Sequence, residues 1–347
     1  MTVITSSPAV PPRSRVAAPL IEAEGLSVSF ASETGFLPAV RGVDLRLEEG
    51  EILGLVGESG SGKSVTCQAL LGLLPASSTF AGCLRVAGET LVLGDALAFE
   101  RLRGGTISMI FQDPMSALDP LMTARAHLHQ RLRRHERRGD GEERMQELLR
   151  RAGVSDTVRV LDAYPHQLSG GLCQRVAIAL ALAGEPRILV ADEPTTALDV
   201  TVQAQVLDLL DDLRRARDLA VILISHDLGV VAEICDRIAV MYAGQIVETG
   251  PVDAVLEQPA HPYTLGLLES RPLLNGPRRK LRAIRGAAPL PNALPSGCAF
   301  SPRCGRSAAV CQVPAVLQPV RSTSSQYHSA GHRLARCHLP LADGAHG

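Results

Sequence analysis

The feature that most constrains this chain is the run "GESGSGKS", residues 57 to 64. It follows the apolar run "EILGLV" and precedes "VTCQALLGLLP", a pattern that predicts a strand, a glycine-rich turn and a helix. In G-x-x-x-x-G-K-[ST] the glycines let backbone N–H groups wrap phosphates without interference from a Cβ atom. Because this turn requires a strand behind it and a helix ahead of it, the sequence predicts an α/β fold.

The residues of this loop have separate expected roles. Lys63 places a positive charge at the β- and γ-phosphates of a nucleotide, and the Ser64 hydroxyl is a candidate Mg²⁺ ligand. The helix that starts here points the positive end of its dipole at the anion. The predicted nucleotide-binding residues are Gly57, Glu58, Ser59, Gly60, Ser61, Gly62, Lys63 and Ser64.

A second apolar strand, "ILVADEP" at residues 188 to 194, ends in two carboxylates. Asp192 is placed to hold Mg²⁺, and Glu193 is placed to act as the general base that polarises an attacking water. An acidic pair after a strand is alone more often a solvated turn. Together with the phosphate loop, the pair predicts nucleoside triphosphate hydrolysis.

Strands and helices alternate along most of the chain. "RILVAD" and "LAVILIS" are continuous apolar runs, typical of parallel strands buried on both faces of a sheet. We expect a loose leader over residues 1–20, a nucleotide-binding domain over 21–270 and a separate C-terminal segment over 271–347. In that last segment prolines and cysteines replace periodic apolar residues.

Composition argues against several other classes of protein. A net charge of −1 gives no overall attraction to nucleic acid. Arginines and histidines gather in residues 125 to 138, but no aromatic side chains lie among them for base stacking, so we interpret the stretch as a solvated helix. No apolar run reaches the roughly 18 residues that span a bilayer. No signal peptide is expected either, so the eight cysteines are expected in a reducing compartment, without structural disulfides.

The motif "LSGG" lies between the phosphate loop and the acidic strand. In this order the three motifs resemble the ATP-binding-cassette (ABC) family, whose ATPase subunits power membrane transporters. The resemblance implies a P-loop NTPase cassette with a RecA-like parallel core, an antiparallel β subdomain and a helical subdomain over about residues 113–183. It also implies that the signature residues contact a nucleotide bound by a second ATPase subunit. Those residues are Ser169, Gly170 and Gly171. Leu172 and Cys173 depart from the family pattern, which suggests altered turnover.

Four further positions match motifs of that family. Gln112 in "FQDP" matches the glutamine that senses Mg²⁺ and the attacking water, and Asp199 in "ALD" matches a loop that communicates across the dimer. His226 in "ISHD" matches the histidine that contacts the γ-phosphate and positions the base. Phe30 matches the position of an aromatic ring that stacks on adenine, although a core phenylalanine is the alternative.

Longer phrases point to one branch of the family. "FQDPMSALDP", "YPHQLSGG", "ADEPTTALDVTVQAQ" and "QPAHPYTLGLLES" resemble the ATPases of oligopeptide, dipeptide and nickel importers. The resemblance implies an ATP-hydrolysing subunit at the cytoplasmic face of the cell membrane. Its expected partners are a second ATPase subunit, two transmembrane permease subunits and an extracytoplasmic solute-binding protein. A nickel or other solute importer, and a soluble non-transport ABC ATPase, are the alternatives.

Four cysteines gather in the C-terminal segment: Cys298, Cys304, Cys311 and Cys337. Their spacing lacks the short knuckles of structural zinc sites, whereas iron–sulfur clusters tolerate varied spacing. The segment resembles the C-terminal part of peptide-importer ATPases, some of which bind a [4Fe–4S] cluster, although Gly305 stands where that family often has proline. A structural [4Fe–4S] cluster is therefore expected, with zinc or four free thiols as alternatives. Small hydrophobic roles are expected for Cys67, Cys83, Cys173 and Cys235.

Overall fold

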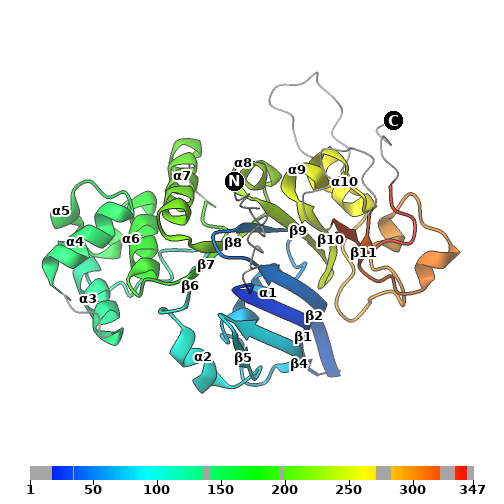
Figure 1. The fold of residues 1–347 in the computed structure, drawn as a ribbon, viewed down its shortest axis with the longest axis horizontal. Coiled ribbons are helices and arrows are strands. Elements are labelled where there is room, and N and C mark those ends of the chain that lie inside the picture. Colours follow the sequence, from blue (N-terminus) through cyan, green and yellow to red (C-terminus); the bar gives the residue numbers. More distant parts are fainter. Residues whose placement is uncertain are drawn as a thin grey trace, which may run out of the picture.

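The fold is taken from a computed structural model of the whole chain. It describes residues 18–33, 35–135, 141–195, 199–270, 283–320 and 333–341. Most of the expected leader therefore lies outside the described residues. Figure 1 shows a central sheet with a helical group on one side, an antiparallel sheet below it and a C-terminal segment on the other side.

Five parallel strands form the centre of the molecule. They lie in the order β9-β3-β8-β7-β6 within an eight-stranded sheet of the described residues. Their bounds are β3 Ile52–Val56, β6 Ile107–Ile110, β7 Ile188–Asp192, β8 Ala220–Ser225 and β9 Arg237–Tyr242. Because parallel strands point their carboxyl ends the same way, the loops after β3, β6, β7 and β8 open at one edge of the sheet. The parallel core predicted from the apolar runs is present.

Consecutive residues of β3 enter two different cores. Leu53 and Leu55 pack with the antiparallel sheet and α1, whereas Ile52 and Val56 pack with the helices on the other face. Both faces are covered, which is why this strand has no polar alternation. Gly54 lies between them, where an added Cβ would stand 2.7 Å from the Val231 side chain.

The antiparallel sheet has the order β2-β1-β4-β5. Its strands are β1 Ile21–Ser32, β2 Gly35–Leu47, β4 Thr79–Val86 and β5 Glu89–Leu91. It is the lower sheet in Figure 1. Residues 38 and 39, in the first half of β2, lie beside the phosphate loop.

Helices cover the rest of the cassette. Their bounds are α1 Lys63–Leu70, α2 Ala96–Leu102, α3 Ala124–Arg134, α4 Glu142–Arg151, α5 Thr157–Asp162, the 3₁₀ turn η1 Pro165–Gln167, α6 Gly170–Leu182, α7 Val200–Arg217 and α8 Leu228–Ile234. Helices α3 to α6 form the group at the left of Figure 1. They pack on one another through buried leucines, among them Leu128, Leu148 and Leu161. The domain boundaries drawn from the sequence stay predictions.

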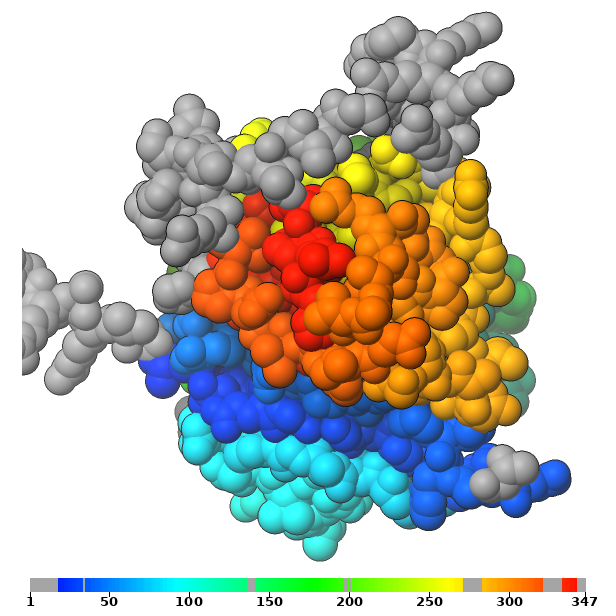
Figure 2. All heavy atoms as spheres, turned by 90° about the vertical axis from the view of Figure 1, so that its right-hand side faces the viewer, coloured from blue at the N-terminus to red at the C-terminus, as the bar shows by residue number. Residues whose placement is uncertain are grey.

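The chain returns to the central sheet at its C-terminal end. After β10 Gln245–Pro251, α9 Val252–Glu257 and α10 Pro262–Glu269, the segment contains the 3₁₀ turns η2 Ser301–Arg303 and η3 Ala309–Gln312 and the short strands β11 Gln318–Pro319 and β12 Leu334–Ala335. β12 pairs antiparallel with β10, and β10 pairs with β9, so these strands widen the central sheet beyond β9. Figure 2 shows this segment, in orange and red, spread over one face of the molecule.

Candidate nucleotide site

The phosphate loop takes the backbone shape that its glycines allow. Gly57 has φ +154° and Gly62, at the start of α1, has φ +103°. An alanine Cβ at Gly57 would overlap the Met241 carbonyl oxygen, and one at Gly62 would lie 2.7 Å from the Ala39 carbonyl oxygen. Both positions therefore require glycine for close packing as well as for conformation.

Lys63 is buried under this loop. Its Nζ donates to the carbonyl oxygens of Gly57 at 2.8 Å and Glu58 at 3.0 Å. Burial lowers the pKa of Lys63, and the nearby carboxylates of Glu193 and Asp192 act in the opposite direction. The Lys63 ammonium therefore lies within the loop. Phosphate oxygens of a bound nucleotide could replace the backbone carbonyls as its hydrogen-bond acceptors there.

The expected magnesium ligands Ser64 and Asp192 are brought together. The Ser64 hydroxyl donates to Asp192 Oδ1 at 3.2 Å, from the first turn of α1 to the end of β7. Burial is the main cause of a raised pKa at Asp192. A divalent cation here would offset that desolvation, since a hard cation prefers carboxylate and hydroxyl oxygens.

Glu193 lies between two of the other predicted residues. Its Oε2 accepts a hydrogen bond from Gln112 Nε2 at 3.1 Å and lies 3.2 Å from His226 Nδ1. These side chains follow β7, β6 and β8 respectively, so the parallel order of the strands brings them to one edge. The backbone of Glu193 has φ +46°, a left-handed conformation that non-glycine residues rarely adopt.

A pocket at this edge contains the phosphate loop and the proposed base. It is lined by Ser59, Gly60, Gly62, Lys63, Ser64, Val65, Gln112, Glu193, Pro38, Ala39, Ala243, Gly244, Pro289, Pro291 and Leu294. The last three belong to the C-terminal segment. These three residues could not be predicted from the sequence, because isolated prolines in a segment without periodicity give no functional signal.

The signature residues lie elsewhere. Ser169 caps α6 by accepting from the Leu172 N–H at 3.4 Å, and Asp199 caps α7 by accepting from the Val202 N–H at 2.9 Å. A Cβ at Gly171 would stand 3.2 Å from Val202, so the two helix starts are neighbours. None of these residues lines the pocket of the phosphate loop.

Phe30 occupies a position in β1. It pairs with Leu37 of β2 and packs, partly buried, against the core beneath the antiparallel sheet. It is not among the residues that line the nucleotide pocket, although Pro38 and Ala39 nearby are. Its stacking role stays a prediction.

The four C-terminal cysteines line one small pocket, together with His261, Pro262, Phe300, Ser301, Arg306 and Leu339. Burial raises the pKa of Cys337 to about 11, with a further contribution from the other three thiols. Across the described part of the chain, however, no group of three or more His, Cys, Asp or Glu side chains has the arrangement that holds a metal ion. The expected cluster is therefore not shown.

Cys173, the departure in the signature helix, is fully buried, and its thiol donates to the Pro165 carbonyl oxygen at 3.5 Å. Cys67 is also fully buried, and burial raises the pKa of its thiol. Cys235 is buried as well. These three cysteines pack as small core side chains, as expected, whereas Cys83 on β4 is only half-buried.

Comparison with protein families gives two matches. Residues 40–196 match the model of the ABC transporter family, and residues 247–311 match the oligopeptide/dipeptide transporter C-terminal region. The first match covers the phosphate loop, Gln112, the signature and the acidic strand end. The class of protein is thus an ABC-type ATP-binding cassette.

Relatives with similar sequences span nearly the whole chain. A putative peptide import ATP-binding protein of Brucella abortus is 47% identical over 92% of this chain and 95% of its own length. The oligopeptide transport ATP-binding protein AppD of Bacillus subtilis is 43% identical over 94% and 98%. The dipeptide transport ATP-binding protein DppD of Haemophilus influenzae is 41% identical over 93% and 96%. The chain belongs to the peptide-import ATP-binding proteins of the ABC transporter family.

Solved structures agree with the fold. A dimeric bacterial ABC transporter cassette is 30% identical, with a TM-score of 0.61 over 67% of this chain and 98% of that chain. A cassette dimer in a post-hydrolysis state with ADP and Pi is 28% identical, with a TM-score of 0.60. Within the described residues, no helix has the length and apolar character to cross a membrane.

Proposed function

We infer that this chain is the ATP-hydrolysing subunit of an ABC importer for peptides. The observation that carries the chemistry is the placement of Glu193 between Gln112 and His226, at the same edge as Lys63 and Ser64. The peptide substrate class is inferred from relatives that are named for peptide, oligopeptide and dipeptide transport.

Each residue of the site has a proposed role in ATP hydrolysis. The loop amides and Lys63 bind the β- and γ-phosphates of ATP, and Glu193 accepts a proton from the attacking water. Gln112 and His226 hold the Glu193 carboxylate toward that water. Ser64 and Asp192 would hold Mg²⁺, which neutralises charge on the phosphate oxygens during transfer.

The signature acts on a second subunit's nucleotide. Ser169 and Gly171 begin α6, a 13-residue helix, so its N-terminus offers backbone N–H groups and a positive dipole to an anion. Since these residues do not line the pocket of their own chain, they are available to a partner. The active form is then a dimer in which each ATP lies between one phosphate loop and the other signature.

The remaining partners follow from the transporter role. We place the dimer at the cytoplasmic face of the cell membrane, on two transmembrane permease subunits that receive peptides from an extracytoplasmic binding protein. Gln112 and the segment after it, which lead into the helical group, are the proposed contact with the permease.

Co-expression with permease genes tests this function. We expect the chain to co-purify with polytopic subunits and to support uptake of labelled di- or oligopeptides, while Glu193→Gln co-purifies but supports no uptake. A chain that stays in the soluble fraction would mean a non-transport ATPase. Uptake of nickel without uptake of peptide would replace the substrate class.

We also propose that Cys298, Cys304, Cys311 and Cys337 hold a [4Fe–4S] cluster. The residues fit such a group because all four cysteines line one pocket, and a cubane holds its ligands farther apart than a single ion does. His261 lines the same pocket. Its Nδ1 accepts from the Tyr263 N–H, which leaves the proton on Nε2, and that buried atom has no partner among the described residues. A cluster sulfur would be an acceptor for it.

Anaerobic purification tests the cluster. We expect about four irons and four sulfides per chain, a broad visible absorption band and loss of both in Cys298→Ser. Stoichiometric zinc, or protein without metal, would reject the cluster. Bound, it would supply folding energy to a segment that buries few apolar side chains.

A further inference from the structure

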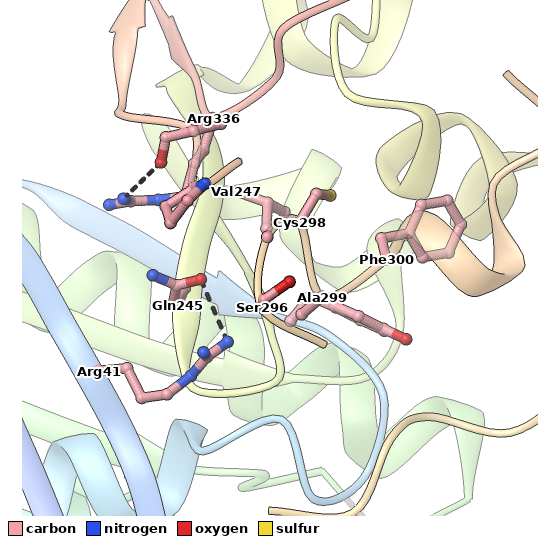
Figure 3. A pocket seen from close by; sticks show the side chains of 12 residues that line it. Arg41, Gln245, Val247, Ser296, Cys298, Ala299, Phe300 and Arg336 are labelled. Carbon is pink, nitrogen blue, oxygen red and sulfur yellow. Dashed lines mark hydrogen bonds between the residues drawn. The ribbon is translucent and has the colours of Figure 1, made fainter. Parts of the chain in front are cut away.

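The C-terminal segment lies directly against the strands that flank the phosphate loop. Figure 3 shows Cys298 and Ala299 near β10 and Phe300 farther from it, in a pocket that also contains Arg41, which donates a hydrogen bond to Gln245. Tyr242, at the end of β9, lines this pocket too. Its ring is 5.3 Å from the Phe300 ring, nearly edge-on, so the segment is fixed here by aromatic packing.

Arg303 extends from this anchored turn to the phosphate loop. Its guanidinium donates to Glu58 through both branches, from Nη1 to Oε2 at 2.7 Å and from Nη2 to Oε1 at 3.0 Å. Nη1 also donates to the Tyr242 hydroxyl at 3.3 Å, and Nε donates to the Arg285 carbonyl oxygen at 2.9 Å. The Arg303 side chain is only 7% exposed. Glu58 is 29% exposed, so the pair is partly buried, and its two parallel hydrogen bonds fix the orientation of both side chains.

Glu58 is the first variable residue of the phosphate loop. Its carbonyl oxygen accepts from Lys63 Nζ, and its N–H donates to the Tyr263 hydroxyl at 2.8 Å. The loop peptide that anchors Lys63 is therefore held by Tyr263 through its backbone and by Arg303 through its side chain. No other contact of the described residues with the Glu58 carboxylate is an ion pair.

Arg303 lies between residues that line the cysteine pocket, and Cys304 of that pocket directly follows it. Cys304 ends the 3₁₀ turn η2, where the Arg303 N–H donates to the Phe300 carbonyl oxygen at 2.9 Å and the Cys304 N–H to the Ser301 carbonyl oxygen at 3.3 Å. Phe300, Ser301 and Cys304 all line the pocket of the four thiols. A change in the position of Cys304 must therefore move the backbone that carries Arg303.

We propose that Arg303 is a positioning residue for the phosphate loop, and that it couples the four-cysteine pocket to the affinity of the nucleotide site. The proposal rests on the proposed function only in taking that site to bind ATP. Arg303 does not line the nucleotide pocket itself. It acts by holding Glu58, and with it the carbonyl oxygens that present Lys63.

Equilibrium binding of a fluorescent ATP analogue to the purified full-length chain tests the first part. We expect Arg303→Met to raise the dissociation constant about tenfold. Arg303→Lys should recover part of this loss, because an ammonium can face Glu58 but cannot make the paired contacts of a guanidinium. In steady-state ATPase assays the KM for ATP should rise more than kcat falls. A purely structural arginine would not produce that split.

Arg333→Met is the matched control. Arg333 is a second buried arginine of the C-terminal segment, 5% exposed, that pairs with Glu248 at 3.0 Å instead of with the phosphate loop. We expect this variant to melt at a lower temperature while its dissociation constant stays within twofold of the wild type. An unchanged dissociation constant in Arg303→Met, or an equal rise in Arg333→Met, overturns the positioning role.

If Arg303→Met does not fold, Arg303→Lys and Glu58→Gln decide the question, since both keep side-chain volume. Unchanged affinity in both rejects the proposal. Wild-type protein that binds no ATP would instead reject the proposed function, so the two failures are distinguishable.

A double-mutant cycle tests the coupling to the thiols. We expect Cys304→Ala to weaken nucleotide binding in the wild-type background and to have no further effect in Arg303→Met. Equal effects in the two backgrounds, or no effect in either, would show that the cysteine pocket does not act through Arg303.

Discussion

At the scale of single residues, Glu193 is the group whose surroundings define the reaction. Its carboxylate meets Gln112 and His226 on one oxygen, in a left-handed backbone conformation that the surrounding packing must maintain. Strained backbone at such a position is consistent with a group held ready for proton transfer.

We expect Glu193→Gln to lower ATP turnover by about a hundredfold or more, because the amide cannot accept the proton of the attacking water. Binding of ATP should remain, since the loop amides and Lys63 are unchanged. Single-turnover kinetics with labelled ATP measures both. Glu233→Gln, an exposed position on α8, is the control and should behave as wild type. Substantial turnover in Glu193→Gln would remove this residue from the role of base.

The residues of the site differ in how well sequence predicts them. Gln112, Asp192, Glu193 and His226 each lie at or just after the end of an apolar strand, and parallel strands bring such positions to one edge, so their proximity could be foreseen. Arg303 could not, because it lies 245 positions from Glu58 and neither residue stands in a periodic pattern. An ion pair across that separation is visible only in the folded chain.

At the scale of elements, the turn between β3 and α1 depends on where it passes close to β9. Gly57 lies against the Met241 carbonyl oxygen, whereas Gly60, with φ +76°, has no heavy atom within 4 Å of an added Cβ. Substitution of Gly57 therefore tests close packing against β9, whereas substitution of Gly60 tests the left-handed backbone without that contact.

We expect Gly57→Ala to abolish nucleotide binding, because the loop must move away from β9. Gly60→Ala should cost about 1–2 kcal/mol of folding free energy for its left-handed backbone, without displacing the loop from β9. Chemical denaturation and ATP titration of both variants measure the difference. Equal loss of binding in the two would mean that conformation, not contact, limits this loop.

The start of α6 combines a cap with a proposed contact to a partner's nucleotide. Ser169→Ala should remove the cap, at about 1 kcal/mol, and should also lower turnover while ATP binding to the isolated chain is unchanged. Thr123→Ala is matched to it, because Thr123 caps α3 by accepting from the Ala126 N–H at 3.3 Å. If both variants lose turnover equally, the effect belongs to helix stability alone.

The signature motif could be recognised from the sequence, whereas the surface that it contacts could not. Its order between the phosphate loop and the acidic strand allowed its recognition, and its location beside α7 is shown by the close approach of Gly171 to the Val202 side chain. Contact with a second subunit depends on an assembly that one sequence does not describe.

At the scale of the whole molecule, the C-terminal segment completes the cassette. Glu248 of β10 is fully buried, accepts from the backbone N–H groups of Ala260 and His261 at 2.8 Å each, and pairs with Arg333. Because the Glu248 carboxylate is fully buried, the stability of its charged form depends on all of these partners.

We expect a chain truncated after residue 270 to be strongly destabilised and to aggregate. It would lose Arg333, which leaves a buried carboxylate without its cation at a cost of about 3–5 kcal/mol, and it would uncover β10. Thermal unfolding and size-exclusion chromatography measure this, with Glu248→Gln in the truncated chain as a partial rescue. A truncated chain as stable as the full one would mean that the segment is only an attachment.

Antiparallel pairing of β12 with β10 has a consequence for the synthesis of the protein on the ribosome. Glu248 and Thr249 find their strand partners in Ala335 and Leu334, so this side of the sheet stays open until a much later part of the message has been translated. An open strand edge invites pairing with another chain. During translation, the residues of the nucleotide site are therefore synthesised before β12, the strand that covers the open edge of β10. A chain released prematurely in that interval would be prone to pair with its neighbours edge to edge.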